Sequence, residues 1–117
     1  MSESIFKLVV EKARDLVAIR ARWTRFALAR TRNDRICDPL DPAAIRFCAY
    51  GALIRSAFMV TGSRETAMLM ARRAARRITG ARSELEAVAD LNALSDLPPA
   101  EARRRLRILF DTALMDA

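Results

Sequence analysis

Five arginines with no acidic residue between them make residues 71–82 the part of this chain with the clearest chemical signal. The segment is ARRAARRITGAR, and its arginines are Arg72, Arg73, Arg76, Arg77 and Arg82. At roughly 100° per helical residue, the first four lie on one face. A guanidinium group binds phosphates and carboxylates through paired N–H donors. The pattern predicts either a surface for nucleic acid or another acidic partner, or a solvated helix face.

The net positive charge of the whole chain also comes almost entirely from arginine. The 117 residues include 21 basic and 14 acidic ones, a formal charge of +7, and only Lys7 and Lys12 are lysines. Residues 63–82 alone hold six arginines against one glutamate. A biased composition explains this excess as readily as a polyanionic partner does. In the solvated interpretation nearby carboxylates partly neutralise the face, and the candidates are Glu84, Glu86, Asp90 and Glu101.

Residue types that carry catalysis or bind metals are scarce. The chain has no histidine, and its two cysteines, Cys37 and Cys48, have a spacing that fits no zinc or cluster motif. The carboxylates Asp34, Asp38 and Asp41 lack the glycine and final glutamate of an EF-hand loop, so turn and capping roles are expected. The three glycines are isolated, which excludes a glycine-rich phosphate loop. We expect no catalytic residue, no metal and no cofactor.

The apolar segments predict neither a signal peptide nor a membrane span. The start MSESIFKLVVEKARD lacks the basic residues and the uninterrupted apolar run of a signal peptide. Arg46 and Arg55 interrupt the longest apolar run, residues 43–60, and each costs about 2.5–3.5 kcal/mol near a bilayer centre. We therefore expect a cytoplasmic protein without membrane contact, in which both thiols stay reduced.

Helical periodicity and capping residues predict an all-α fold. Alanine, leucine, arginine and glutamate dominate the composition and favour helix. The expected helices cover residues 4–22, 24–30, 42–58, 63–80, 83–92 and 98–114, with a loop at 31–42. The third of these is apolar nearly all round, so its neighbours should surround it. The prediction is a single compact domain, 1–117, of about five or six helices around a buried central helix at about 42–59.

Three stretches of the chain follow a known pattern. They are WTRFALAR (23–30), DPLDPAAIRFCAYGAL (38–53) and LNALSDLPPAEARRRLRILFDTAL (91–114). They resemble a family of small uncharacterised bacterial and phage proteins with W-T-x-G-x-x-A-R, then D-P-x-A-x-R-W-C-A-x-G-A-L, then an asparagine before a closing helix with F-D-x-A. The resemblance implies no known activity. The family-typical positions that it gives here are Trp23, Thr24, Arg30, Arg46, Cys48, Gly51, Asn92, Phe110 and Asp111.

The chain also departs from that pattern. Phe26 stands in place of a glycine and Phe47 in place of a tryptophan, while Ala93 and the region of Pro98 replace an aspartate and a threonine–histidine pair. A site that uses those polar groups in relatives is expected to be damaged or missing in this chain.

The retained positions have mainly structural interpretations. Cys48 is expected to be a small core residue, and Gly51 to mark the close approach of another helix backbone. Arg46 is expected to bind a loop carboxylate, either Asp38 or Asp41.

Three functions from different classes fit these observations. The first is a non-enzymatic protein that binds another macromolecule, with a protein as the favoured partner and with Arg30 and Asn92 as candidates for a partner contact or a polar network. The second is nucleic-acid association through the arginines of residues 72–82, joined by those of 103–107. The third is small-ligand binding in an aromatic pocket near Trp23 and Tyr50. This pocket would be lined by Trp23, Phe26, Phe47, Tyr50 and Phe58, although aromatic residues at such spacing more often fill a core.

Overall fold

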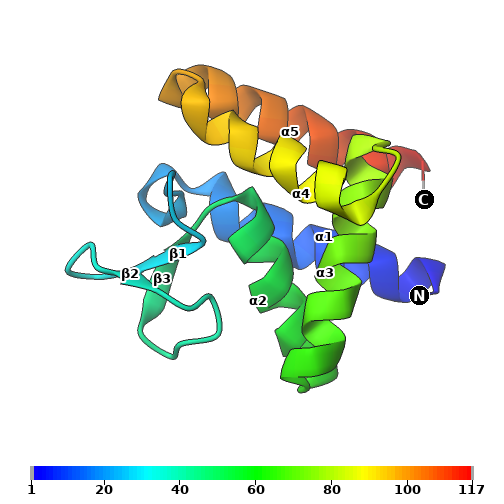
Figure 1. Ribbon diagram of the computed structural model, residues 1–117, viewed down its shortest axis with the longest axis horizontal. Helices are drawn as coiled ribbons and strands as arrows, with labels where there is room; N and C mark the ends of the chain where they lie inside the picture. Colours follow the sequence, from blue (N-terminus) through cyan, green and yellow to red (C-terminus); the bar gives the residue numbers. More distant parts are fainter. Residues whose placement is uncertain (1, 117) are drawn as a thin grey trace.

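The computed structural model describes residues 2–116, which contain five α-helices, two short 3-10 helices and three short strands joined by loops (Figure 1). The α-helices are α1 (Glu3–Ala18), α2 (Ala49–Thr61), α3 (Arg64–Thr79), α4 (Glu84–Ala93) and α5 (Pro99–Asp116). The 3-10 helices are η1 (Arg20–Arg22) and η2 (Leu94–Asp96), and the strands are β1 (Ala29–Thr31), β2 (Ile36–Cys37) and β3 (Ala44–Phe47). The fold is mostly helical, but the all-α prediction missed the sheet.

Local capping chemistry sets the ends of α3 and α4 where the sequence predicts them. The Ser63 hydroxyl accepts a hydrogen bond from the Thr66 N–H at 3.2 Å, and Gly80 ends α3 in the left-handed region with a φ of 70°. The Ser83 hydroxyl accepts in the same way from the Glu86 N–H at 3.1 Å. The caps at Ser63 and Gly80 set the first and last residues of α3, the helix that carries the arginines.

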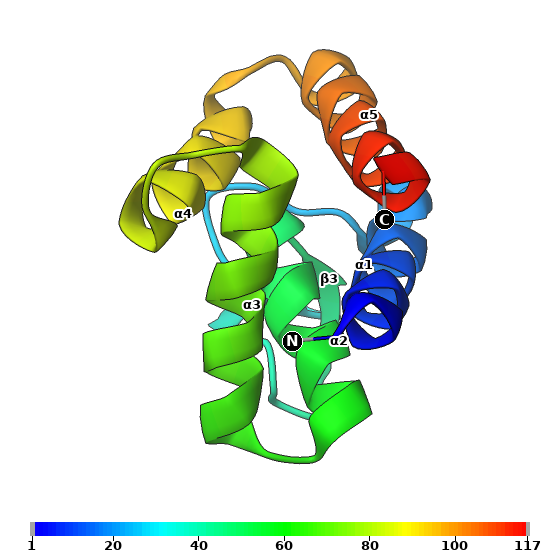
Figure 2. The same ribbon diagram turned by 90° about the vertical axis from the view of Figure 1, so that its right-hand side faces the viewer.

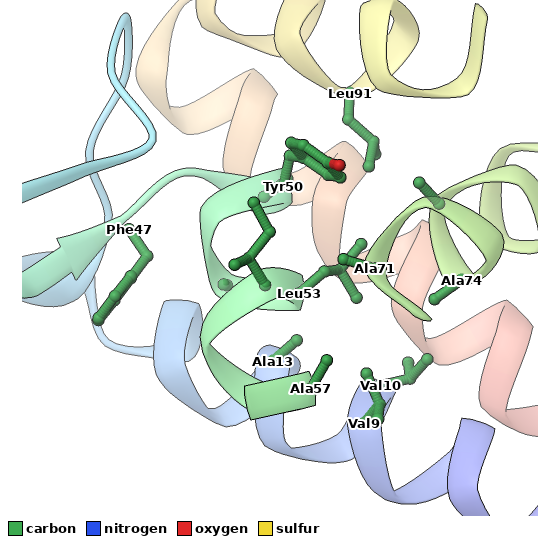
Figure 3. Packing of buried hydrophobic residues seen from close by; sticks show 14 of the residues in the cluster. Val9, Val10, Ala13, Phe47, Tyr50, Leu53, Ala57, Ala71, Ala74 and Leu91 are labelled. Atoms are coloured by element: carbon green, nitrogen blue, oxygen red, sulfur yellow. The ribbon is translucent and has the colours of Figure 1, made fainter. Parts of the chain in front are cut away.

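The core lies around α2, which packs against α1 on one side and α3 on the other (Figures 1 and 2). Figure 3 shows Leu53 and Ala57 of α2 between the α1 side chains and those of α3. Alanines at these contacts, such as Ala13 and Ala71, let the helix axes approach closely, and all four of these side chains are fully buried. The buried central helix is thus confirmed, with bounds later than the expected 42–59.

Residues 24–37, expected to form a short helix and a loop, contain a hairpin instead. β1 pairs antiparallel with β2 and with β3, so the strand order is β2-β1-β3. Asp34 turns the chain with a φ of 65°, a conformation that aspartate tolerates better than most residues. Phe26, where the resembled pattern has glycine, also has a positive φ of 62°. Two left-handed residues so close together break any helix across this segment.

The predicted helix start at Asp41 and Pro42 is also wrong. The Asp41 carboxylate accepts from the Ala43 N–H at 2.8 Å and its carbonyl from the Ala44 N–H at 2.9 Å, which closes a turn. β3 follows this turn and pairs with β1. Helix α2 begins only after Cys48, whose Sγ accepts from the Gly51 N–H at 3.4 Å.

Across the described residues, no helix combines the length and the apolar character needed to cross a membrane.

Candidate functional site: the arginine face of helix α3

The four arginines Arg72, Arg73, Arg76 and Arg77 all lie on the exposed face of α3, as predicted. The opposite face is buried and consists mainly of small residues: Ala67, Ala71, Ala74, Ala75 and Ile78. Arg82 is exposed in the turn between α3 and α4. We call Arg72, Arg73, Arg76 and Arg77 the α3 arginine face.

The carboxylates expected to neutralise this face do not pair with it. Glu101 binds Arg104 and Arg105 of its own helix, at 3.1 and 2.9 Å. Within residues 2–116, Glu84, Glu86 and Asp90 form no ion pair, and neither do Arg72, Arg73 and Arg76. Most of the α3 arginine face therefore keeps its charge available for a partner.

Arg77 differs from the other three arginines because it ties α3 to α1. Its guanidinium donates to the Glu3 carboxylate at 2.6 Å and lies over the Phe6 ring, 3.9 Å from the ring centroid. The hydrogen bond from Arg77 lowers the pKa of Glu3 below its ordinary value. Arg77 is therefore occupied within the fold.

An open hollow of about 430 Å³ marks the C-terminal end of the face. It is lined by Arg73, Arg76, Arg77, Gly80, Ala81 and Glu84. One turn before the arginines, Leu69 is 46% exposed. Deeper in the structure, burial raises the pKa of Tyr50, and the neighbouring Arg72 acts against this rise. The face thus combines three guanidinium groups that form no ion pair within residues 2–116 with exposed apolar surface.

The family-typical positions Trp23, Thr24 and Gly51 meet where the hairpin joins α2. The Thr24 N–H donates to the Phe47 carbonyl at 3.0 Å, and Trp23 forms an isolated bridge with Phe47. A Cβ on Gly51 would lie 1.8 Å from the Leu28 carbonyl oxygen. The predicted close approach at Gly51 is confirmed. The approaching backbone, however, is that of Leu28, in the loop before β1, and not that of another helix.

Arg30 and Arg46 are cross-strand neighbours on β1 and β3. Both lie near the Asp34 carboxylate, at 4.0 and 3.5 Å, and Arg46 also donates to the Thr31 carbonyl at 3.4 Å. The prediction that Arg46 binds Asp38 or Asp41 is therefore wrong. Asp38 instead binds Arg64 and accepts from the Leu40 N–H at 2.8 Å, a turn role of the predicted kind. Arg30 thus belongs to a polar network with Asp34 and Arg46, and this network links the strands of the hairpin to β3.

The predicted aromatic pocket is not a single lined cavity. Phe47 and Tyr50 are buried and Phe26 is 62% exposed. A hollow of about 340 Å³ lies beside them and is lined by Phe26, Ala27, Leu28, Cys48, Asn92, Ser95 and Asp96. Cys48 is buried as expected, and burial raises the pKa of its thiol. A raised pKa keeps the thiol protonated, which disfavours it as a nucleophile.

A second groove, between α1 and α5, involves residues whose partnership the sequence analysis did not predict. Arg14 of α1 and Arg103 of α5 both line it. The periodicity of each helix shows which side is charged, but no local pattern indicates that two helices so far apart in sequence lie side by side.

Comparison with known proteins gives a family but no described activity. No curated protein and no solved structure matches the chain. One family model matches residues 2–110 and carries the description "family of unknown function (DUF6197)". The chain therefore belongs to this family of unknown function.

Proposed function

We propose that the protein works without catalysis, by binding another protein through the α3 arginine face. The observation that carries this proposal is the stripe Leu69, Arg72, Arg73 and Arg76, spaced i, i+3, i+4 and i+7 on one exposed helix side. Exposed apolar residues next to arginine are common in protein interfaces, and Leu69 adjoins the arginines at one end of this stripe. Guanidinium groups without a carboxylate partner favour a binding partner that presents carboxylates.

The acidic residues around the stripe favour a protein over a nucleic acid. Glu65 precedes Leu69 by one helical turn, and Glu84 lines the hollow at the other end of the face. A continuous phosphate backbone laid along α3 would meet both carboxylates, whereas a protein partner can place its own charges between them. Nucleic-acid association is the alternative, and the net charge of +7 is the observation that favours it.

The family-typical positions support a structural use of the sequence motifs. Trp23, Thr24 and Gly51 join the hairpin to α2, and Arg30 and Arg46 hold Asp34. These contacts give each residue a role in the fold without assigning it a catalytic role, which agrees with the proposal of a binding protein. A bacterial or phage origin and a cytoplasmic location are part of the proposal.

The test compares two triple variants with equal charge. The first removes the face (Arg72→Gln, Arg73→Gln and Arg76→Gln). The control removes three arginines exposed elsewhere (Arg20→Gln, Arg22→Gln and Arg35→Gln). Each immobilised protein is incubated with an extract of the source organism, and captured proteins are quantified by mass spectrometry.

A protein captured by the wild type and by the control variant, but not by the face variant, supports the proposal once the purified pair binds directly. Fluorescence anisotropy with labelled duplex and single-stranded DNA and RNA at two salt concentrations tests the alternative. Tight, salt-sensitive binding that the face variant loses would replace the protein partner with nucleic acid. Identical behaviour of both variants in all assays would make the face a solvated surface.

A further inference from the structure

A groove of about 440 Å³ runs between α1 and α5, which lie side by side (Figure 2). Its volume falls in the range of about 300–1,000 Å³ that is usual for small-ligand sites. Val17 of α1 and Leu106 and Phe110 of α5 form its apolar floor, and all three belong to the core. Ala18 and Ala100, which are both exposed, lie in its walls and add apolar surface.

The walls of this groove are strongly basic. Arg14, Arg103, Arg104 and Arg107 line it, against a single acidic residue, Asp111. Arg14 is held by Asp111 at 3.4 Å and Arg104 by Glu101 at 3.1 Å. Within residues 2–116, Arg103 and Arg107 form no ion pair. They are one helical turn apart, so two unneutralised charges share one side of α5.

Arg103 also has a polar atom that the fold leaves without a partner. Its Nε is buried and has no hydrogen-bond acceptor within the described residues. Buried N–H groups almost always find an acceptor, in the protein or in a bound molecule. α5 begins at Pro99, so Arg103 lies near the positive end of the helix dipole.

From these features we propose that the α1–α5 groove binds a small organic anion with a carboxylate or phosphate head and an apolar tail. The head is held by Arg103 and Arg107, which together supply planar N–H donors. The tail covers the apolar surface that Ala18, Ala100 and Val17 present to the groove. An inorganic anion would leave this floor unfilled, and a neutral lipid would leave the guanidinium groups unpaired. The site is separate from the α3 arginine face and does not rest on the function proposed for that face.

The test is isothermal titration calorimetry of the full chain with octyl phosphate and with octanoate, each below the concentration at which it forms micelles. Inorganic phosphate and 1-octanol are the matched probes for head alone and tail alone. We expect one amphiphile per chain, with each single-feature probe weaker by at least about tenfold. The stronger of the two amphiphiles identifies the preferred head group.

Two independent variants locate the binding. Arg103→Gln with Arg107→Gln removes the head contacts, and we expect a loss of at least about tenfold. Ala18→Trp fills the groove from an exposed position without changing its charge, and we expect it to abolish binding. Arg73→Gln with Arg76→Gln removes the same charge from α3 and should leave the affinity unchanged. Circular dichroism checks that each variant is folded.

Two results would overturn the proposal. Inorganic phosphate that binds as tightly as octyl phosphate would show that the apolar floor contributes nothing. Unchanged octyl phosphate affinity in Ala18→Trp would place binding outside the groove. Because Arg103 is partly buried, the double variant is the one more prone to unfold, and in that event Ala18→Trp decides the question alone.

Discussion

Replacing Gly51 with alanine tests the junction between the hairpin and α2. The new Cβ would lie 1.8 Å from the Leu28 carbonyl oxygen and 2.7 Å from its carbon, whereas real Cβ contacts essentially never fall below 3.0 Å. The oxygen must therefore retreat by the difference of 1.2 Å between 3.0 and 1.8 Å. That oxygen accepts a hydrogen bond from the Cys48 N–H at 3.2 Å, just before α2 begins.

The expected cost follows from three contributions. Breaking the Cys48–Leu28 hydrogen bond beside a buried helix end costs about 1–3 kcal/mol. Overpacking the junction costs about 1–3 kcal/mol more. The better helix propensity of alanine offsets about 1 kcal/mol. We expect the free energy of unfolding to fall by about 3 kcal/mol, equivalent to roughly 10 °C in Tm for a domain of this size.

Urea denaturation followed by circular dichroism at the helical band measures this difference. Gly62→Ala is the matched control, because Gly62 ends α2 with a φ of 68° and has nothing within 4 Å of its Cβ position. That variant carries only the conformational cost of about 1 kcal/mol. A Gly51→Ala protein as stable as the wild type, or no less stable than Gly62→Ala, would refute the close-packing argument.

Two further predictions concern residues that the hairpin and its loops hold in place. Phe26→Gly should raise the stability by about 0.5–1 kcal/mol, because it relieves left-handed strain of about 1–2 kcal/mol at a φ of 62°, partly offset by the freedom of glycine in the unfolded chain; a loss of stability in urea denaturation would mean that the exposed ring packs usefully. The hydrogen bond from Arg64, and then that from the Leu40 N–H, lower the pKa of Asp38 below its ordinary value of 3.8. A lowered folded-state pKa gives stability that is present above 3.8 and is lost as the pH falls through the lowered value. The wild type should therefore lose its Tm advantage over Asp38→Asn on acidification, and an advantage that persists in strong acid would contradict this origin.

The parts of the fold that the sequence predicts well are those controlled by neighbouring residues. Ser63, Ser83 and Gly80 cap their helices through hydrogen bonds or backbone geometry that span only a few positions. The α3 arginine face follows from helical periodicity alone. For the same reason, the positions of Arg72 and Arg76 could be predicted before any tertiary contact was known.

The parts that the sequence analysis got wrong depend on contacts between distant segments. Ala44–Phe47 is apolar apart from Arg46, and it becomes a strand only because β1 supplies its hydrogen-bond partners. Periodicity alone does not separate a short apolar strand from a buried helical turn. Asp41 and Pro42 suit a turn as well as a helix start, and the pairing of β3 decides for the turn. The α1–α5 groove has the same origin, since Arg14 and Arg103 meet only through helix packing.

The number of arginines in this chain is a poor guide to function, because neighbouring residues decide what each one does. Arg46, Arg55 and Arg77 bind carbonyls, carboxylates or rings of elements distant in sequence, so they hold the fold together. Five other arginines form no ion pair within residues 2–116: Arg72, Arg73 and Arg76 on α3, and Arg103 and Arg107 on α5. Like charges kept together without counter-charges reduce stability. Arg20, Arg22 and Arg35 are exposed and also form no ion pair within residues 2–116. On α3 and in the α1–α5 groove, however, the unpaired arginines line a hollow, and binding of an acidic partner or ligand there would remove this cost.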